Sequence, residues 1–334
     1  ADASPQANLL ADVTHALAFR RQPVEVGGVK LPHPLMLAAG FVKGHGFTDE
    51  ASALQAVQNG VNIIPGWRSV PKLLGIVEIG SFTRYPRIGN PGTVIWRDVS
   101  TQSTQNRVGL RNPGAEAAAT FLQRNIVNLP LIFGINIAAS PGVEDDEQAA
   151  REVTEAVHAF VRHSIVPNWF TLNISCPNTE DDPEGQQTEQ KTRSLCKAVQ
   201  EQIRADGYNT PLWVKVSPGL SAEQYRILMR VFVEENVKAV IATNTLGQPT
   251  PDGSGLQAGV GGGRLAATSL QAADILQDEK LQQGYAVDIV GCGGITSHEQ
   301  YLKYKARGIQ AVQYWSALVY QGPLAAALIE SGMV

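Results

Sequence analysis

Eight short apolar runs alternate with longer stretches of helical period from residue 35 onward, and this alternation restricts the fold more than any other feature. The runs span residues 35–40, 76–81, 129–137, 169–175, 212–218, 238–245, 286–294 and 311–318. The interior runs are nearly continuous in apolar residues, as strands buried on both faces should be. Eight such units predict an α/β fold, a closed (β/α)8 TIM barrel. An open doubly wound sheet is the alternative, but no GxGxxG segment follows the first run.

The segments outside this pattern are expected to surround a single barrel domain of residues 23–334. Residues 1–22 predict an N-terminal helical segment, in which NLLADVTHALAFRR forms an amphipathic helix that caps the barrel floor. Between the runs, SAEQYRILMRVFVEEN begins with Ser221 as a helix N-cap. Residues 60–75 contain two prolines and predict a long loop or a small hairpin. Residues 82–115 are rich in Gly, Pro, Asn and Arg, and loops of this length are often functional.

Composition argues against several kinds of partner and site. The net charge of −4 gives no reason to expect nucleic acid, which favours a concentrated basic face. Cys176, Cys196 and Cys292 are odd in number and widely spaced, so we expect no disulfide framework and a reducing, cytoplasmic location. No apolar run approaches the roughly 20 residues of a membrane span. No metal site is expected.

Polar residues gather where the predicted strands end, which is the edge at which barrel enzymes carry their chemistry. They are Lys43, Asn136, Asn173, Cys176, Asn178, Lys215, Thr243, Asn244, Thr245 and Ser316, beside the small residues Ala39, Gly40, Gly293 and Gly294. A single asparagine at a strand end is more often a turn former than a ligand. Several amides and hydroxyls at one mouth instead predict a pocket for a small, planar molecule with several carbonyl and N–H groups.

Lys215 lies inside an apolar run, where a buried ammonium is unfavourable without a partner. An anionic group of a ligand is expected there, and Asp288 is the alternative partner. The pair Gly293–Gly294 after the seventh run and Ser316 in the eighth are typical of the phosphate site of such a barrel, which uses backbone N–H groups at helix N-termini.

Taken in order, these segments resemble the motifs of dihydroorotate dehydrogenases. The motifs are LMLAAGFVKG, NRVGLRNPG, GINI, NISCPNT, VKVSP, ATNT, GCGGI and SALVYQGP, and the match runs from about residue 24 to 325. The resemblance implies a (β/α)8 barrel that binds FMN and oxidises dihydroorotate to orotate in pyrimidine synthesis. Two alternatives are an FMN-dependent oxidoreductase acting on another pyrimidine-like ring, and a non-catalytic barrel that binds a phosphorylated ligand.

The same resemblance implies roles for individual residues. Cys176 holds the place of the general base, which removes the C5 proton while a hydride passes from C6 to FMN N5. The substrate positions are Lys43, Asn106, Arg107, Val108, Gly109, Leu110, Asn173, Asn178, Asn244 and Thr245. The flavin positions are Ala39, Gly40, Lys43, Ser81, Asn136, Asn173, Lys215, Thr243, Gly263, Gly293, Gly294, Trp315 and Ser316.

The chemistry of these residue types agrees with such roles. A thiol has an ordinary pKa near 8.5 and can act as a base at neutral pH if cations or amide donors lower its pKa. Lys43 could supply that positive field or pair with the substrate carboxylate. Lys215 could stabilise the negative charge of reduced FMN.

The sequence combines features of two groups within the family. Soluble members have a Cys base, whereas membrane-associated members have a Ser base and an N-terminal pair of helices that forms a quinone tunnel. AAGFVKG and VEIGSFTRYPRIGNPG resemble the second group, and Cys176 resembles the first. The N-terminal segment has room for one helix rather than two. The electron acceptor therefore stays open among fumarate, a quinone, NAD through a partner subunit and oxygen, and both peripheral membrane contact and a homodimer stay open.

Overall fold

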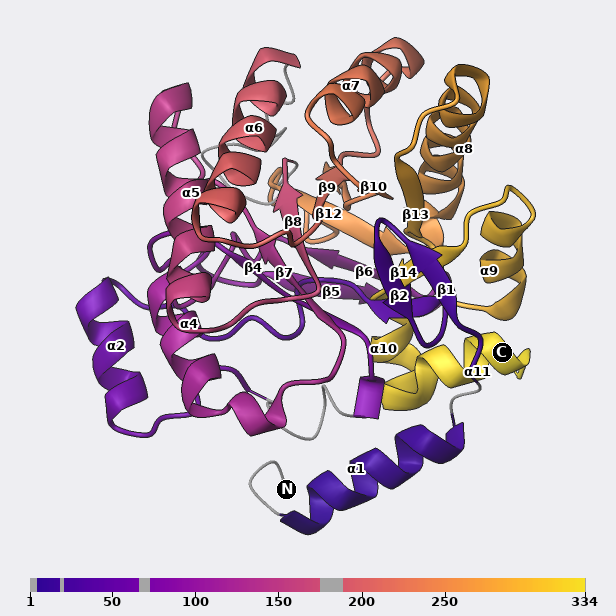
Figure 1. The fold of residues 1–334 in the computed structure, drawn as a ribbon. Coiled ribbons are helices and arrows are strands. Elements are labelled where there is room, and N and C mark those ends of the chain that lie inside the picture. Colours follow the sequence, from indigo (N-terminus) through magenta and orange to yellow (C-terminus); the bar gives the residue numbers. More distant parts are fainter. Residues whose placement is uncertain (1–4, 19–20, 66–72, 175–188, 334) are drawn as a thin grey trace.

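The computed structural model describes residues 5–18, 21–65, 73–174 and 189–333, and it confirms the predicted barrel. Eight parallel strands close in the order β10-β13-β14-β3-β4-β7-β8-β9 (Figure 1). They are β3 (Leu35–Leu37), β4 (Val77–Phe82), β7 (Phe133–Ile137), β8 (Trp169–Asn173), β9 (Leu212–Val216), β10 (Ala239–Ala242), β13 (Asp288–Cys292) and β14 (Ala311–Tyr314). Each strand coincides with a predicted run. The eighth run was predicted too long, because β14 ends at Tyr314 and Ser316 begins a helix.

Helices surround the strands, as Figure 1 shows for α4 to α8. The helices after β3 are α2 (Glu50–Gln58), α4 (Ala115–Arg124), α5 (Asp146–Arg162), α6 (Glu189–Ala205), α7 (Ala222–Glu234), α8 (Ala266–Gln283), α9 (His298–Lys305), α10 (Ser316–Gln321) and α11 (Ala325–Ser331), with 3-10 turns at Ile126–Asn128, Gly263–Leu265 and Gly322–Leu324. The predicted N-cap of α7 is confirmed: Ser221 Oγ accepts from Gln224 N at 3.2 Å, and Gln224 Oε1 accepts from Ser221 N at 2.8 Å. This reciprocal pair satisfies two backbone donors at the helix start.

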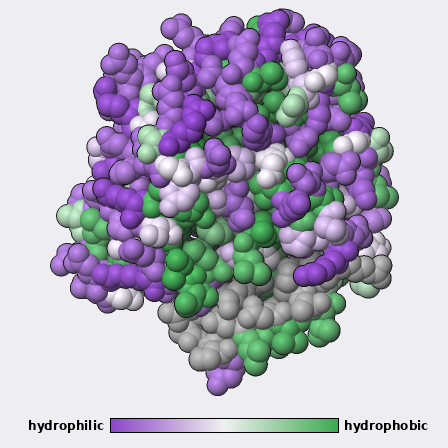
Figure 2. All heavy atoms as spheres, viewed as in Figure 1, coloured by the Kyte–Doolittle hydropathy of each residue, from purple (hydrophilic) through white to green (hydrophobic). Residues whose placement is uncertain are grey.

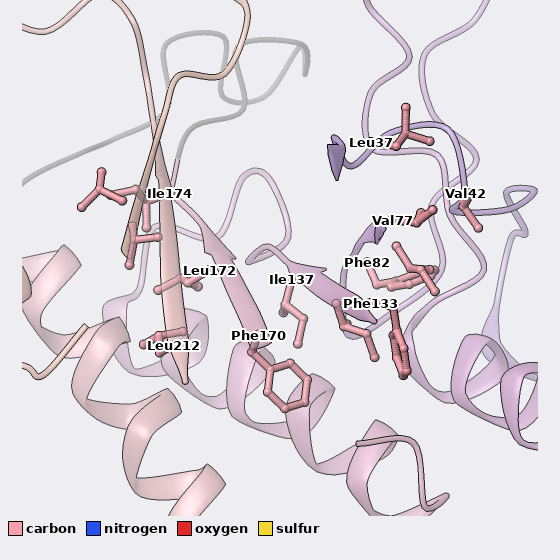
Figure 3. Close-up of a cluster of buried hydrophobic side chains, with 14 of the residues drawn as sticks. Leu37, Val42, Val77, Phe82, Phe133, Ile137, Phe170, Leu172, Ile174 and Leu212 are labelled. Carbon is pink, nitrogen blue, oxygen red and sulfur yellow. The ribbon is translucent and has the colours of Figure 1, made fainter. Parts of the chain in front are cut away.

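Side chains alternate along each barrel strand between the helical layer and the barrel interior. In β8, Phe170 and Leu172 belong to the large hydrophobic cluster between strands and helices, part of which Figure 3 shows. Trp169 belongs instead to a second cluster, and Thr171 donates to a carboxylate inside the barrel. Burial of one large apolar side chain contributes roughly 1.5–3 kcal/mol, so the outer cluster fixes which face of each strand points inward.

A hairpin closes the N-terminal end of the barrel. It consists of β1 (Val24–Val26) and β2 (Val29–Leu31), whose apolar side chains pack in one cluster with Trp169 and Trp213. The two indoles are stacked with ring centroids 4.5 Å apart, and Trp213 Nε1 donates to Gly27 O at 3.0 Å. The prediction that an N-terminal helix caps the floor is therefore wrong, because the hairpin occupies that place.

The predicted N-terminal helix does form, as α1 (Pro5–Ala18), and it lies below α11 in the view of Figure 1. Leu9, Leu10 and Leu17 are 66%, 66% and 83% exposed, and hydrophobic residues of this helix lie on the surface in Figure 2. Within the described ranges, no helix is both long enough and apolar enough to cross a membrane.

A second sheet lies in the segments that connect the barrel strands. Its four strands are antiparallel in the order β11 (Leu246–Pro249), β12 (Gln257–Gly262), β6 (Ser103–Asn106) and β5 (Ile95–Asp98). Residues 82–115, expected to be a loop, thus contain two strands. β5 pairs with β6, and β6 also pairs with β12, some 150 positions away in the chain. The described parts of residues 60–75 contain no strand, so no hairpin forms within residues 60–65 or 73–75.

We expect Gly134→Ala to destabilise the barrel by about 1–3 kcal/mol, because an added methyl group overpacks the floor. A Cβ at Gly134 would lie 2.1 Å from Trp169 Cε2. Urea unfolding measures the change in free energy. The matched control is Gly219→Ala, whose Cβ would lie no closer than 3.8 Å to another residue. Equal stability losses in the two variants would contradict this account of the floor.

Candidate functional site

A cavity of about 490 Å³ opens at the carboxyl ends of the barrel strands. The structure brings most of the predicted site residues to its wall, namely Ala39, Gly40, Lys43, Ser81, Asn106, Val108, Gly109, Leu110, Asn173, Lys215, Thr243, Asn244, Thr245, Gly293, Gly294, Trp315 and Ser316. They come from seven of the eight barrel strands or the loops after them, and from β6 of the second sheet. The parallel arrangement explains this convergence, since all eight strands end at the same rim.

Three predicted residues do not line the cavity. Arg107 is buried, and its Nη1 donates to Pro91 O at 3.2 Å, so the guanidinium has a structural partner. Gly263 lies beyond the wall in the turn after β12, and Asn136 is fully buried inside the barrel. Cys176 and Asn178 lie outside the described residues.

Asparagine side chains form a short polar chain across the cavity wall. Asn244 Nδ2 donates to Asn173 Oδ1 at 3.4 Å, and Asn173 Nδ2 donates to Ser81 Oγ at 3.4 Å. Asn244 Oδ1 also accepts from Thr245 N at 2.9 Å, which holds the amide in place. A ligand with carbonyl and N–H groups can meet donors and acceptors of matching kind on this wall.

Glycines form another part of the wall, between β13 and α8. Gly293 and Gly294 have φ of +123° and +73°, a region that only glycine adopts readily. A Cβ at Gly293 would lie 2.2 Å from Ser269 Oγ, and a Cβ at Gly294 would lie 2.3 Å from Ala266 Cα. The backbone here is therefore packed against α8 while its other side faces the cavity.

Hydroxyl groups stand beside these glycines. Ser316 Oγ and Thr104 Oγ1 share a buried hydrogen bond of 2.8 Å, and Thr243 Oγ1 and Ser269 Oγ share one of 2.7 Å. Hydroxyls and backbone N–H groups in such a setting are suited to phosphate oxygens.

The charge of the wall is positive. Lys43, His45, Arg111 and Lys215 line the cavity, and none of the described lining residues is an aspartate or glutamate. The alternative partner of Lys215 is excluded, because Asp288 Oδ1 accepts from Lys280 Nζ at 2.6 Å and Asp288 Oδ2 from Gly27 N at 2.8 Å. An anionic ligand would find complementary charge at this site.

Sequence reasoning missed two polar residues inside the barrel. Glu78 is fully buried, and Gln313 is fully buried yet contributes to the cavity wall. Both interrupt an apolar strand, in IVEIG and AVQYW, which is the same signal that drew notice to Lys215. Arg111 and His45 were also missed, since both follow a motif residue in a loop whose course the sequence does not fix.

Two cysteine thiols are buried within the described residues. Cys292 ends β13 at the cavity wall, and burial raises the pKa of its thiol, with Lys215 acting in the opposite direction. Burial also raises the pKa of the Cys196 thiol on α6. A raised pKa leaves little thiolate, so neither group should be reactive near neutral pH.

In a Cys176→Ala variant we therefore expect slow labelling of the two remaining thiols by a thiol reagent at pH 8. Labelling should be at least 100-fold slower in the native protein than in urea, because unfolding restores an ordinary pKa and access to the reagent. The native rate should stay low up to about pH 9, since a raised pKa moves thiolate formation to higher pH. Fast labelling of either cysteine in the native variant would contradict the burial described here.

Comparisons with known proteins identify a family and relatives of this chain. The family model described as "Dihydroorotate dehydrogenase" matches residues 22–334. A protein of Chromobacterium violaceum named dihydroorotate dehydrogenase (quinone) is 31% identical over 91% of this chain and 82% of its own length. A protein of Polynucleobacter asymbioticus with the same name is 29% identical over 90% of this chain and 83% of its own.

Solved structures resemble the fold. The crystal structure of DHODH from Eimeria tenella in complex with ferulenol has a TM-score of 0.75 and 22% identity, covering 99% of this chain and 91% of that chain. A ligand-free structure from the same organism has the same TM-score and 23% identity. At this identity the likeness concerns the fold alone.

Proposed function

Because the chain belongs to the dihydroorotate dehydrogenase family, a family of oxidoreductases, we propose that it oxidises dihydroorotate to orotate with FMN as its bound cofactor. The observation that carries this proposal is the cavity itself. It combines amide groups, four basic side chains and a glycine-rich wall at the carboxyl ends of the strands, without a described carboxylate. Dihydroorotate and FMN are both anionic, and both have edges of alternating carbonyl and N–H groups.

The described residues fit FMN at two points. The backbone at Gly293 and Gly294, with Ser316 beside it, would hold the phosphate. Lys215 is a buried cation at the cavity wall, so it would offer a charged donor to the ring system. When bound, FMN supplies the acceptor for the hydride that leaves the substrate.

The chain's own residues would bind and orient the substrate. Asn106, Asn173 and Asn244 would hold its amide edges, and Lys43 would pair with its carboxylate. Both contacts fix the ring against rotation, which brings the carbon next to the carbonyl toward the loop after β8.

Cys176 in that loop would take the C5 proton as general base. The basic side chains of the cavity wall would favour a thiolate at Cys176, since a positive field lowers the pKa of a thiol. With the proton on sulfur, the pair of electrons left on carbon forms the double bond of orotate as the hydride departs from C6.

For the electron acceptor we propose a quinone. The relatives from C. violaceum and P. asymbioticus both carry that word in their names. The exposed leucines of α1 support contact with an apolar partner or a membrane surface. The protein is reduced anaerobically, and a quinone, fumarate, NAD or oxygen is then added in separate samples. Faster reoxidation by any of the other three acceptors would reject a quinone.

Purified protein should be yellow, and dihydroorotate should bleach it in the absence of oxygen. Dihydrouracil is the matched control, because it has the same ring without the carboxylate that Lys43 would bind. We expect dihydrouracil to reduce the flavin at least 100-fold more slowly at equal concentration. A colourless protein, or no bleaching by dihydroorotate, would reject the proposed function.

Replacement of the general base should slow the reaction without loss of the cofactor. For Cys176→Ala we expect flavin reduction to fall about 10²–10⁴-fold, since this is the usual contribution of a positioned base. FMN content, measured by absorbance, should be unchanged. Cys196→Ala serves as control because that thiol is buried on α6 away from the cavity, and its reduction rate should match the unchanged protein. A Cys176→Ala rate within threefold of the unchanged protein would remove Cys176 from this role.

A further inference from the structure

A carboxylate lies inside the barrel, below the cavity and away from water. Glu78 of β4 is 0% exposed, and four side chains donate to it. They are Asn136 Nδ2 to Oε1 at 2.7 Å, and Thr171 Oγ1 at 2.9 Å, Gln313 Nε2 at 2.9 Å and Trp169 Nε1 at 3.2 Å to Oε2. These donors come from three different strands, β7, β8 and β14. All four contacts use the carboxyl oxygens as acceptors, which is the role that a carboxylate has in hydrogen bonding.

All four donors are neutral, so the charge of Glu78 still needs a counter-charge nearby. Gln313 provides the link to one. Its Nε2 donates to Glu78 Oε2, and its Oε1 accepts from Lys215 Nζ at 3.3 Å. One amide thus stands between a carboxylate and an ammonium, with each end of its dipole toward the charge of opposite sign. Because Nε2 is engaged by Glu78, the carbonyl end must face Lys215.

Both charges act on the same part of the cavity wall. Burial raises the pKa of the Cys292 thiol on β13; Lys215 lowers it and Glu78 raises it further. Among the described residues named in this network, Glu78, Lys215 and Cys292 are titratable, and the other partners are neutral. Lys215 and Gln313 reach the cavity wall, whereas Glu78 does not.

We propose that Glu78 is a positioning residue for Lys215, holding the Gln313 amide in one orientation and supplying the counter-charge of the ammonium at the cavity wall. Glu78 touches neither substrate nor cofactor in this proposal. Its consequence for the reaction rests on the proposed function: the pair of charges sets how strongly the wall favours reduced, anionic FMN over oxidised FMN. Removal of the carboxylate leaves a lone cation there.

The test compares Glu78→Gln with Glu78→Asp in the purified holoenzyme. Glutamine has the shape of glutamate without its charge, whereas aspartate keeps the charge and loses volume. We expect Glu78→Gln to increase the ratio of affinities for reduced and oxidised FMN at least tenfold, which is about 30 mV in the midpoint potential of a two-electron couple. Glu78→Asp should change this ratio less than threefold. If Glu78→Gln left this ratio unchanged and Glu78→Asp changed it, Glu78 would only fill space, and the proposal would be overturned.

Glu152→Gln is the matched control. Glu152 is 6% exposed on α5, and its Oε2 accepts from Ser140 N at 3.0 Å outside the cavity wall. The same chemical change at this second buried carboxylate should leave the midpoint potential unaltered. An equal shift in this variant would show that the effect does not come from Glu78 and Lys215.

A second measurement does not depend on FMN. Urea unfolding of the purified variants gives the factor by which Glu78→Gln raises the unfolding equilibrium constant. This factor should be at least tenfold smaller when Lys215→Met is also present, because both charges are then gone. Additive effects would overturn the proposal, as would a Glu78→Gln chain that fails to fold and is not rescued by Lys215→Met. If the unchanged protein holds no FMN, the proposed function fails, but this cycle still measures the coupling of Glu78 and Lys215.

Discussion

Each barrel strand turns every second side chain toward the barrel axis, and the rest of the structure depends on this alternation. The outward residues are apolar and pack against the helices, so they fix the register of every strand. Once that register is fixed, the height of each inward side chain inside the barrel is fixed as well. Trp169, Thr171 and Asn173 of β8 therefore lie at the floor, in the middle and at the mouth of the same barrel.

The interior changes in character from floor to mouth. Stacked indoles and the β1–β2 hairpin close the floor with apolar surface. Above them lies a layer in which Glu78 accepts from neutral side chains and Gln313 connects it with Lys215. This layer is a buried polar core in which most polar atoms satisfy one another, whereas Asn136 Oδ1 has no partner among the described residues. Its upper side is the wall of the cavity, so the same side chains fill the barrel and determine the polar groups of the site.

The mouth is completed by chain segments far apart in sequence. β6 and β12 pair in the second sheet, and this places Asn106 and Thr104 beside Gly261 and Gly262 at the cavity. Lys43 and Arg111 add positive charge from the loops after β3 and β6, and His45 lies beside them at the wall. The cavity mouth thus consists of loops and an added sheet, while the barrel strands supply the rest of the wall.

The sequence by itself determined the number and order of the barrel strands, because apolar runs of strand length separated by helical periods have few other solutions. It also predicted half of the residues that line the cavity, partly because parallel strands end at one rim and partly through the family resemblance. It did not determine the pairing of β6 with β12 on one side and with β5 on the other, because these segments carry no clear strand periodicity and gain their hydrogen bonds from each other. Nor did it decide that Arg107 is buried, that a hairpin closes the floor, or that Lys215 faces Gln313 and Glu78 rather than Asp288. Those outcomes depend on which side chains the closed barrel brings into contact, and only the tertiary structure sets these distances.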